Sequence, residues 1–274
     1  MSPPTESRPR LVDAALLGLL HGPAEMVPIS SSGHATLVPW LLDLPYAKLP
    51  ASRRKAIEVA LHAGTAAALA VAPPRSAIES RGAIRSLPLT GLMIAPSAAV
   101  GLLARARIGR SLGTPSTIAV GLLAGSVALA GAEACRGSRA AVDLSPADAL
   151  KVGAAQVLAL WPGFSRSAAT ITAARAIGFA AGDAARIARS GVVPTSVAAA
   201  ALEGIGVVRE GRLREDGPAL AVATGVAFGS TLASRRLAGV LENGGSLVPW
   251  ILLRTASAMV TLLRIRSLGD DGPQ

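Results

Sequence analysis

Residues 21–34 read His21-Gly-Pro-Ala-Glu-Met-Val-Pro-Ile-Ser-Ser-Ser-Gly-His34 and interrupt an otherwise apolar sequence. Apolar residues precede this segment over 11–20 and resume over 35–42. Each flank is shorter than the roughly 17 to 25 residues that a helix needs to cross a bilayer. Backbone at membrane depth must be hydrogen-bonded inside the protein or line a water-filled cavity. A break rich in proline, glycine and serine therefore predicts a re-entrant helix pair and a candidate site.

The whole chain has the composition of a membrane protein. Of its 274 residues, 51% are hydrophobic and 16% are charged, whereas roughly 25% of the residues of a soluble domain are charged. The mean hydropathy is +0.49. Six further apolar stretches approach or reach the length of a membrane helix: 57–72, 87–104, 116–135, 190–208, 218–233 and 247–263. These features predict an all-α integral membrane protein, a polytopic helical bundle.

A second interruption, Trp161-Pro-Gly-Phe-Ser-Arg-Ser167, separates apolar stretches at 149–160 and 168–181. Alignment of the two interruptions pairs Pro28 with Pro162, Ser31 with Ser165 and Thr36 with Thr170. Breaks at matching places in two halves are typical of inverted repeats whose discontinuous helices meet at a buried site. We therefore expect one transmembrane domain over 1–274, with about six spans and two re-entrant pairs. The first repeat covers about 11–135 and the second about 147–266.

The net charge of +10 does not indicate a nucleic-acid-binding protein. The 27 Lys and Arg residues are scattered through the connections and are not grouped with aromatic residues on one face. They occur in connections on both predicted sides, so the charge pattern does not set the orientation in the bilayer. The single cysteine, Cys135, excludes an intramolecular disulfide and a cysteine-based metal cluster. The oligomeric state, including a homo-oligomer, is left open.

The first interruption concentrates polar groups at the start of a helix. Five such residues fall within ten positions, next to Pro28 and Gly33: Glu25, Ser30, Ser31, Ser32 and His34. Serine hydroxyls and free backbone N–H groups at a helix start favour an anion. The carboxylate, hydroxyls and imidazole together supply an acid, a base, a nucleophile or a ligand. For any one of these residues alone, a capped helix start with a hydrogen-bonded core histidine explains the pattern better.

The second interruption supplies positive charge. Arg166 lies between Ser165 and Ser167, directly before an apolar helix. An arginine at a helix start is disfavoured by the helix dipole, so an anionic partner gripped by its forked donors is the simpler explanation. The alternative is that Arg166 extends to the lipid headgroups. Arg254 lies inside the apolar stretch 247–263 and is a third pointer to a site. One carboxylate and two guanidiniums indicate a phosphorylated substrate rather than a proton pathway.

Other polar residues give a weaker signal. Glu58 and His62 lie four positions apart in the stretch 57–72, where they either line the same cavity or satisfy each other. The chain has no P-loop, GxGxxG, HExxH or CxxC pattern. This absence argues against nucleotide-driven and zinc chemistry.

The sequence resembles a known family at three segments. These are the interruption at 21–34, the segment Leu158-Ala-Leu-Trp-Pro-Gly-Phe-Ser-Arg-Ser-Ala-Ala-Thr-Ile171 and the segment Ser246-Leu-Val-Pro-Trp-Ile-Leu-Leu-Arg254. They resemble the signature regions of the bacterial undecaprenyl-diphosphate phosphatases, membrane enzymes linked to bacitracin resistance. Their order and spacing agree over nearly the whole chain, and the second segment is highly specific.

This resemblance implies hydrolysis of a C55 polyprenyl diphosphate to the monophosphate and inorganic phosphate, which recycles the lipid carrier of cell-wall synthesis. It implies a multi-pass protein of the bacterial cytoplasmic membrane whose site faces the outer side. It also implies residue roles. Glu25 matches the motif carboxylate, Ser31 the nucleophile, His34 the motif histidine, Arg166 and Arg254 the phosphate-binding arginines, and Ser165, Ser167 and Thr170 the surrounding hydroxyls.

The resemblance further implies a divalent cation, Mg²⁺ or Ca²⁺, held by Glu25 and the residue at position 21. The family pattern has a glutamate where this chain has His21. Because magnesium and calcium prefer oxygen ligands, an imidazole either weakens a site for these ions or shifts it toward a softer metal.

Other functions remain open at this stage. One alternative is a divergent paralogue that acts on another lipid phosphate. A second alternative is a transporter or flippase of a phosphorylated polyprenyl lipid, because inverted repeats with broken helices also serve alternating access. A structural scaffold is a third class. The clustered Ser31, His34 and Glu25 favour chemistry, since transport needs no nucleophile.

Overall fold

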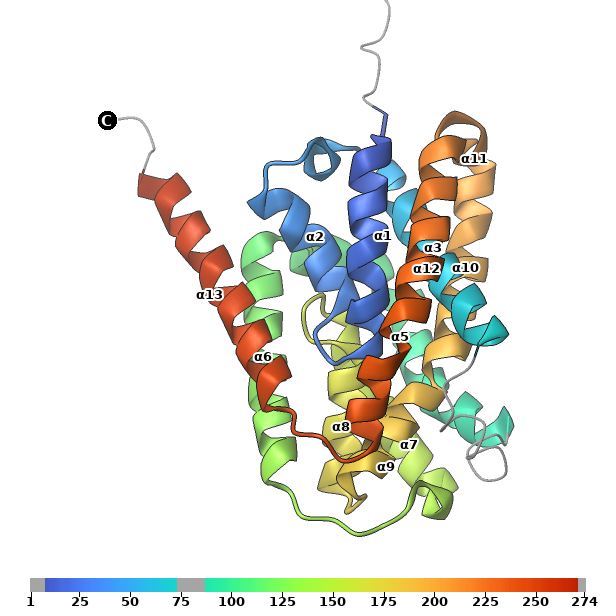
Figure 1. The fold of residues 1–274 in the computed structure, drawn as a ribbon, viewed down its shortest axis with the longest axis vertical. Helices are drawn as coiled ribbons and strands as arrows, with labels where there is room; N and C mark the ends of the chain where they lie inside the picture. Colours follow the sequence, from blue (N-terminus) through green and yellow to red (C-terminus); the bar gives the residue numbers. More distant parts are fainter. Residues whose placement is uncertain (1–7, 73–86, 271–274) are drawn as a thin grey trace, which may run out of the picture.

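Figure 1 shows the computed structural model of the chain, a bundle of helices drawn with its long axis vertical. The structure describes residues 8–72 and 87–270, and these residues contain no β-strand. In chain order the elements are α1 (Leu11–Met26), α2 (Ser31–Leu41), η1 (Pro45–Lys48), α3 (Ala51–Val71), α5 (Leu87–Leu112), α6 (Pro115–Ala134), η3 (Ala141–Asp143), α7 (Pro146–Ala155), η4 (Gln156–Leu160), α8 (Arg166–Ala176), α9 (Ala181–Ser190), α10 (Val192–Arg209), α11 (Arg212–Glu215), α12 (Gly217–Glu242) and α13 (Val248–Asp270).

The apolar stretches predicted from the sequence lie in helices. Four helical segments of the described chain are long and apolar enough to cross a membrane: α6, Ala181–Arg209 (which joins α9 and α10), α12 and α13. Pro88–Ala104 of α5 is a shorter apolar helix. Large apolar side chains stand exposed on these helices, with Leu103 89%, Val127 74% and Leu252 63% exposed. Such surfaces suit lipid, and the chain is a polytopic all-α membrane protein.

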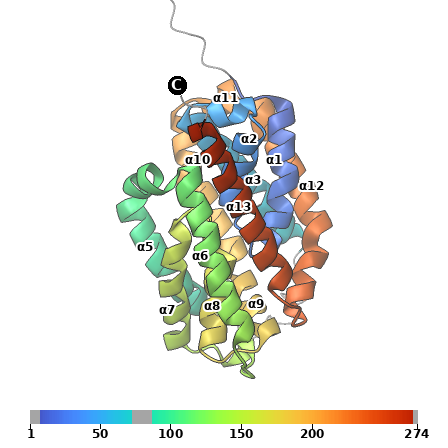
Figure 2. The same ribbon diagram turned by 90° about the vertical axis from the view of Figure 1, so that its left-hand side faces the viewer.

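Two helical hairpins enter the bundle from opposite ends. Figures 1 and 2 show α1 and α2 at the end that carries η1 and α11, and α7 and α8 at the other end. Their tips meet in the middle, where the Gly163 N–H of the second interruption donates to Ser30 Oγ of the first at 3.2 Å. The contact between the two breaks agrees with the predicted arrangement. A relation between two inverted repeats stays a prediction, and 73–86 of the predicted first repeat lie outside the described residues.

Separate apolar cores support the two hairpins. One cluster joins α1, α3 and α12 through fully buried Leu17 and Ile57. Another joins α7, α8 and α9 through fully buried Val152, Phe179 and Ile187. Each hairpin is thus fixed by neighbours of its own, and the polar tips are held between two well-packed regions.

The first helix extends further than the sequence predicted. Helix α1 continues through Gly22 and Pro23 to Met26, so the break narrows to residues 27–30. Proline inside a helix is normally disruptive, but close packing holds this one in place. A Cβ atom at Gly22 would overlap the backbone of Ser230 and Thr231 in α12. At 1.5 Å per residue α1 is about 24 Å long, which is still short of a bilayer core.

Both returning helices begin with the same unusual cap. Ser30 and Ser165 each have a φ of 76°, in the left-handed region, and are the N-cap residues of α2 and α8. Each hydroxyl accepts a 3.3 Å hydrogen bond from the N–H three residues on, Gly33 and Ala168 respectively. This geometry pairs Ser30 with Ser165, one position away from the pairing of Ser31 with Ser165 that the alignment predicted.

Candidate active site

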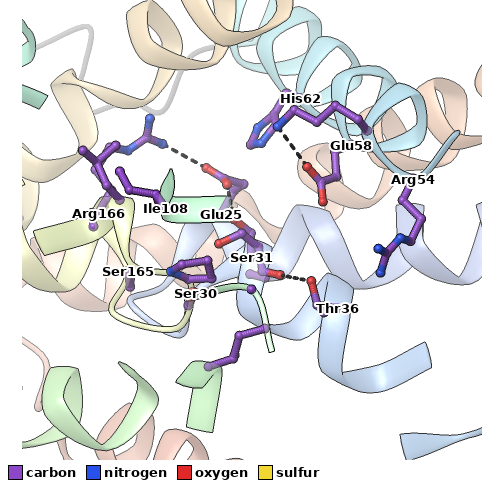
Figure 3. Close-up of a pocket in the computed structure, with 18 of the residues that line it drawn as sticks. Glu25, Ser30, Ser31, Thr36, Arg54, Glu58, His62, Ile108, Ser165 and Arg166 are labelled. Carbon is purple, nitrogen blue, oxygen red and sulfur yellow. Dashed lines mark hydrogen bonds and ion pairs between the residues drawn. The ribbon is translucent and has the colours of Figure 1, made fainter. Parts of the chain in front are cut away.

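A cavity of about 670 Å³ lies where the two interruptions meet α3, α5 and α10. Figure 3 shows the polar side chains that converge on it. Its polar lining from the two breaks and α3 consists of Glu25, Ser30, Ser31, Ser32, Arg54, Lys55, Glu58, His62, Ser165, Arg166 and Ser167. The volume falls within the range of about 300 to 1,000 Å³ found for small-molecule sites.

Three residues at the centre of this cavity form one hydrogen-bonded group. Glu25, at the end of α1, is 7% exposed. Its Oε1 accepts a hydrogen bond from the hydroxyl of Ser31, the first residue of α2. Its Oε2 accepts a hydrogen bond of 3.1 Å from Nη2 of Arg166, the first residue of α8. Figure 3 shows Arg166 reaching Glu25 from the second interruption. The structure thus brings together a hydroxyl, a carboxylate and a guanidinium from both breaks.

The remaining predicted serines divide into two groups. Ser30 and Ser165 line the cavity, but their hydroxyls already cap α2 and α8. Ser32 and Ser167 also line the cavity and are available to a ligand. Gly33 and Thr170 lie outside the lining: Gly33 packs against Ser30 and Gly163, and the Thr170 hydroxyl donates to the Arg166 carbonyl at 2.9 Å. They shape the two helix starts rather than contact a substrate.

His34 is placed differently from the prediction. It is not among the residues that line the cavity. Its Nδ1 lies 2.9 Å from the Ser30 carbonyl, and its Nε2 lies 3.3 Å from Oγ of Ser257 in α13. Because α13 packs against this side of α2, the imidazole lies between the two helices and away from Glu25. The prediction that His34 transfers protons is therefore not supported by the geometry.

Arg254 is also outside the cavity lining, although it was predicted to bind substrate. Its side chain is fully buried. Nη1 donates to the Pro28 carbonyl at 3.0 Å, and Nη2 donates to the carbonyls of Gly163 and Phe164, both at 3.0 Å, and of Leu122 at 3.1 Å. The guanidinium thus ties the backbone of the first break to that of the second. Arg254 is a positioning residue in this geometry.

The sequence signal was weakest for the residues that α3 and α10 contribute. Lys55 Nζ pairs with Glu58 at 3.1 Å and with Glu203 of α10 at 2.8 Å, and all three line the cavity. The spacing of Lys55 and Glu58 on one helix face was visible in the sequence, but Glu203 lies in a distant helix. Glu58 and His62 line the cavity without pairing with each other in the contacts described.

One group of side chains has the composition of a metal site. Ligand atoms of His21, Glu25 and His62 all lie within 4.8 Å of one another. Magnesium and calcium prefer six or more oxygen ligands, whereas this group offers two imidazoles and one carboxylate. The donors therefore do not fit the Mg²⁺ or Ca²⁺ predicted from the sequence. His21 stands where the family pattern has a glutamate, and His62 of α3 adds a second imidazole beside it. The sequence did not connect His62 with His21.

Comparison with known proteins identifies the family of the chain. A family model described as "Bacitracin resistance protein BacA" matches residues 14–260. An undecaprenyl-diphosphatase of Ruegeria sp. (strain TM1040) is 34% identical over 273 residues, covering 92% of this chain and 97% of the relative. The undecaprenyl-diphosphatase of Ruegeria pomeroyi is 34% identical over 267 residues, with 90% and 96% covered. That of Nitratidesulfovibrio vulgaris (strain DP4) is 35% identical over 202 residues, with 69% and 74% covered. The chain belongs to the BacA bacitracin resistance family.

Proposed function

We propose that this protein is an undecaprenyl-diphosphate phosphatase, which releases inorganic phosphate from undecaprenyl diphosphate and leaves undecaprenyl phosphate. The observation that carries the proposal is the Ser31, Glu25 and Arg166 group inside a cavity of a polytopic membrane protein. A nucleophile held by a carboxylate beside a guanidinium is what attack on a phosphate ester or anhydride requires. Relatives that align with nearly the whole chain carry the name of this activity.

The geometry supports a two-step reaction. Arg166 binds the terminal phosphate and offsets its negative charge, while Glu25 accepts the proton of the Ser31 hydroxyl. The Ser31 oxygen bonds to the terminal phosphorus as the bond to the bridging oxygen breaks, and undecaprenyl phosphate leaves with that oxygen. Glu25 passes its proton to the departing undecaprenyl phosphate and is again a carboxylate. Water then attacks the phosphoserine as Glu25 accepts a proton from it, and Glu25 returns this proton to the Ser31 oxygen as the bond from that oxygen to phosphorus breaks and inorganic phosphate is released. Arg166 bonds to Glu25 in the structure, so substrate phosphate competes with the carboxylate for the same guanidinium.

The lipid chain of this substrate exceeds the cavity. A cavity of about 670 Å³ accepts the diphosphate and the first prenyl units, and the rest of the 55-carbon chain extends into the bilayer. Ile108 of α5, Ile118 of α6 and Leu160 of η4 contribute apolar lining that suits the prenyl units. We place the protein in the bacterial cytoplasmic membrane with its cavity open to the outer side, where the diphosphate of the spent carrier is found.

Phosphate release from purified protein tests the proposal. Protein in detergent, supplied with undecaprenyl diphosphate or farnesyl diphosphate, is expected to release inorganic phosphate. The Arg166→Ala variant removes a charged donor to the terminal phosphate and should lower turnover on the order of 100 to 1,000-fold. Arg236→Ala is the matched control, because Arg236 is exposed on α12. No release, together with exchange of a phosphorylated lipid between the leaflets of vesicles, would identify a transporter instead.

A further inference from the structure

The group formed by His21, Glu25 and His62 has the geometry of a slightly opened metal site, with ligand atoms within 4.8 Å of one another. His21 and Glu25 lie four residues apart on α1 and therefore on one face of that helix, and His62 comes from α3. The rings of His21 and His62 meet edge to face, with centroids 4.7 Å apart and an interplanar angle of 85°. Donor atoms around a tetrahedral zinc ion lie about 3.4 Å apart. Side-chain rotations that move the donor atoms by about 1 Å therefore close the group around an ion.

The imidazoles of this group have polar atoms without partners. His21 is 4% exposed, and within the described parts of the chain neither of its ring nitrogens has a hydrogen-bond partner. Its Nε2 lies 4.0 Å from Glu25 Oε1, beyond hydrogen-bond distance. His62 Nδ1 is buried and also lacks a partner there. Buried polar atoms are normally satisfied, because leaving them desolvated costs free energy. These nitrogens therefore indicate a ligand.

The chemistry of the donors selects the class of ligand. Two imidazole nitrogens and one carboxylate suit zinc and neighbouring divalent transition metals, and three protein ligands leave a coordination position free for a further group. A carboxylate has about four lone-pair positions, so Glu25 can accept from Ser31 and Arg166 and still offer oxygen to an ion. Glu25 and His62 both line the cavity, which places the group at the wall of the candidate active site.

We propose that His21, Glu25 and His62 bind a divalent transition metal of the zinc class, in preference to magnesium or calcium. The site has no HExxH or CxxC pattern in the sequence, because its ligands come from two helices that are separated in the sequence. The inference rests on the proposed function only for the role of the metal in the cavity. Metal binding itself is measured without any enzymatic assay.

Metal analysis of the purified full-length protein tests the proposal. Protein in detergent is stripped with a chelator, incubated with Zn²⁺ and freed of unbound metal. We expect one zinc ion per chain by mass spectrometry of the metal content, retained in a large excess of Mg²⁺ or Ca²⁺. Incubation with Co²⁺ in place of zinc should give the visible absorption of cobalt bound to nitrogen and oxygen ligands.

Variants identify the ligands. His21→Ala and His62→Ala should each lower zinc affinity on the order of 100-fold or more. His34→Ala is the matched control, because His34 is the remaining histidine of the chain and lies against Ser257. This variant should leave zinc binding unchanged. His21→Glu should weaken zinc binding and strengthen binding of Mg²⁺ or Ca²⁺, because it restores an oxygen ligand. Thermal unfolding and gel filtration confirm that each variant is folded.

The outcomes separate this proposal from the proposed function. Wild-type protein that retains no zinc, or zinc binding that survives both alanine substitutions, overturns the metal site and assigns water to the unpartnered nitrogens. If such a protein still releases phosphate, the proposed function stands without the metal site. Conversely, zinc binding that depends on His21 and His62 in a protein that releases no phosphate supports the site and overturns the function.

Discussion

At the scale of single residues, the proposed reaction depends on Ser31, whose hydroxyl donates to Glu25 inside the cavity. Removal of this hydroxyl removes the proposed nucleophile and leaves the phosphate-binding guanidinium of Arg166 in place. We expect Ser31→Ala to lower the turnover number on the order of 1,000-fold or more, with substrate binding retained. Phosphate release and binding of undecaprenyl diphosphate, measured separately, check this expectation.

Ser97→Ala is the control for this variant. Ser97 of α5 lines the same cavity, but its hydroxyl donates to the Ile94 carbonyl of its own helix at 3.0 Å. Its loss should leave the turnover number close to that of the wild type. If Ser31→Ala also turns over at the wild-type rate, then a water molecule attacks the phosphorus and Ser31 has no covalent role.

At the scale of elements, Arg254 connects α13 to the backbone of both interruptions. Arg254→Ala removes the guanidinium donor from the buried carbonyls of Pro28, Gly163 and Phe164, and we expect it to destabilise the fold on the order of 3 kcal/mol. Gly125→Ala should have a similar effect, because a Cβ atom there would overlap Nη2 of Arg254. Thermal unfolding in detergent measures both. Unfolding of both variants at the wild-type temperature would show that Arg254 does not hold the two breaks together.

A second element-scale prediction concerns the start of α7, outside the membrane-spanning helices. Asp148 accepts hydrogen bonds from Arg139 at 2.7 Å and from the Ser145 hydroxyl at 2.8 Å. The bond from Arg139, followed by those from Ser145, lowers the pKa of Asp148 from 3.8 to about 2. A lowered folded-state pKa stabilises the fold fully above about pH 4, and this contribution is lost as the pH falls toward 2.

Thermal unfolding measured between pH 4 and pH 2 checks this prediction. Asp148→Asn removes the titrating group, so its unfolding temperature should fall less over this interval than that of the wild type. Because Arg139 is partly exposed, added salt should reduce the difference. An identical pH dependence in the wild type and in Asp148→Asn would contradict the assignment.

At the scale of the whole molecule, the cavity has a defined direction. Its lining includes Tyr46 of η1 and Pro115, the first residue of α6. In Figure 1, η1 and the start of α6 lie away from the end of the bundle at which α6 finishes and η3 follows. Exposed Lys48 lies at the cavity end, and exposed Ser138 follows α6 at the other end. In a Cys135→Ala background, Lys48→Cys should react with a membrane-impermeant maleimide added to intact cells. Ser138→Cys should react only after the membrane is permeabilised, and the reverse result would place the cavity on the inner side.

The sequence by itself determined the class of the molecule and the location of its centre. Long apolar stretches identified a helical membrane protein, because so much apolar surface is stable against lipid and not against water. Two polar interruptions located the candidate site, because non-helical backbone at membrane depth must be buried in the protein or line a water-filled cavity. Local chemistry pointed to Glu25, Arg166 and the serines of the first break, and the family resemblance singled out Ser31 among them. The structure brings Glu25, Ser31 and Arg166 into one group.

The tertiary structure decided which way each of the other side chains faces. Packing against α12 carries α1 through Pro23, and packing against α13 turns His34 away from the cavity. Arg254 holds backbone carbonyls from segments more than 90 residues away in the sequence, and His62 of α3 joins His21 of α1. The physical reason is the same in each case: sequence spacing fixes which residues share a helix face, but only the contacts between helices fix what that face meets.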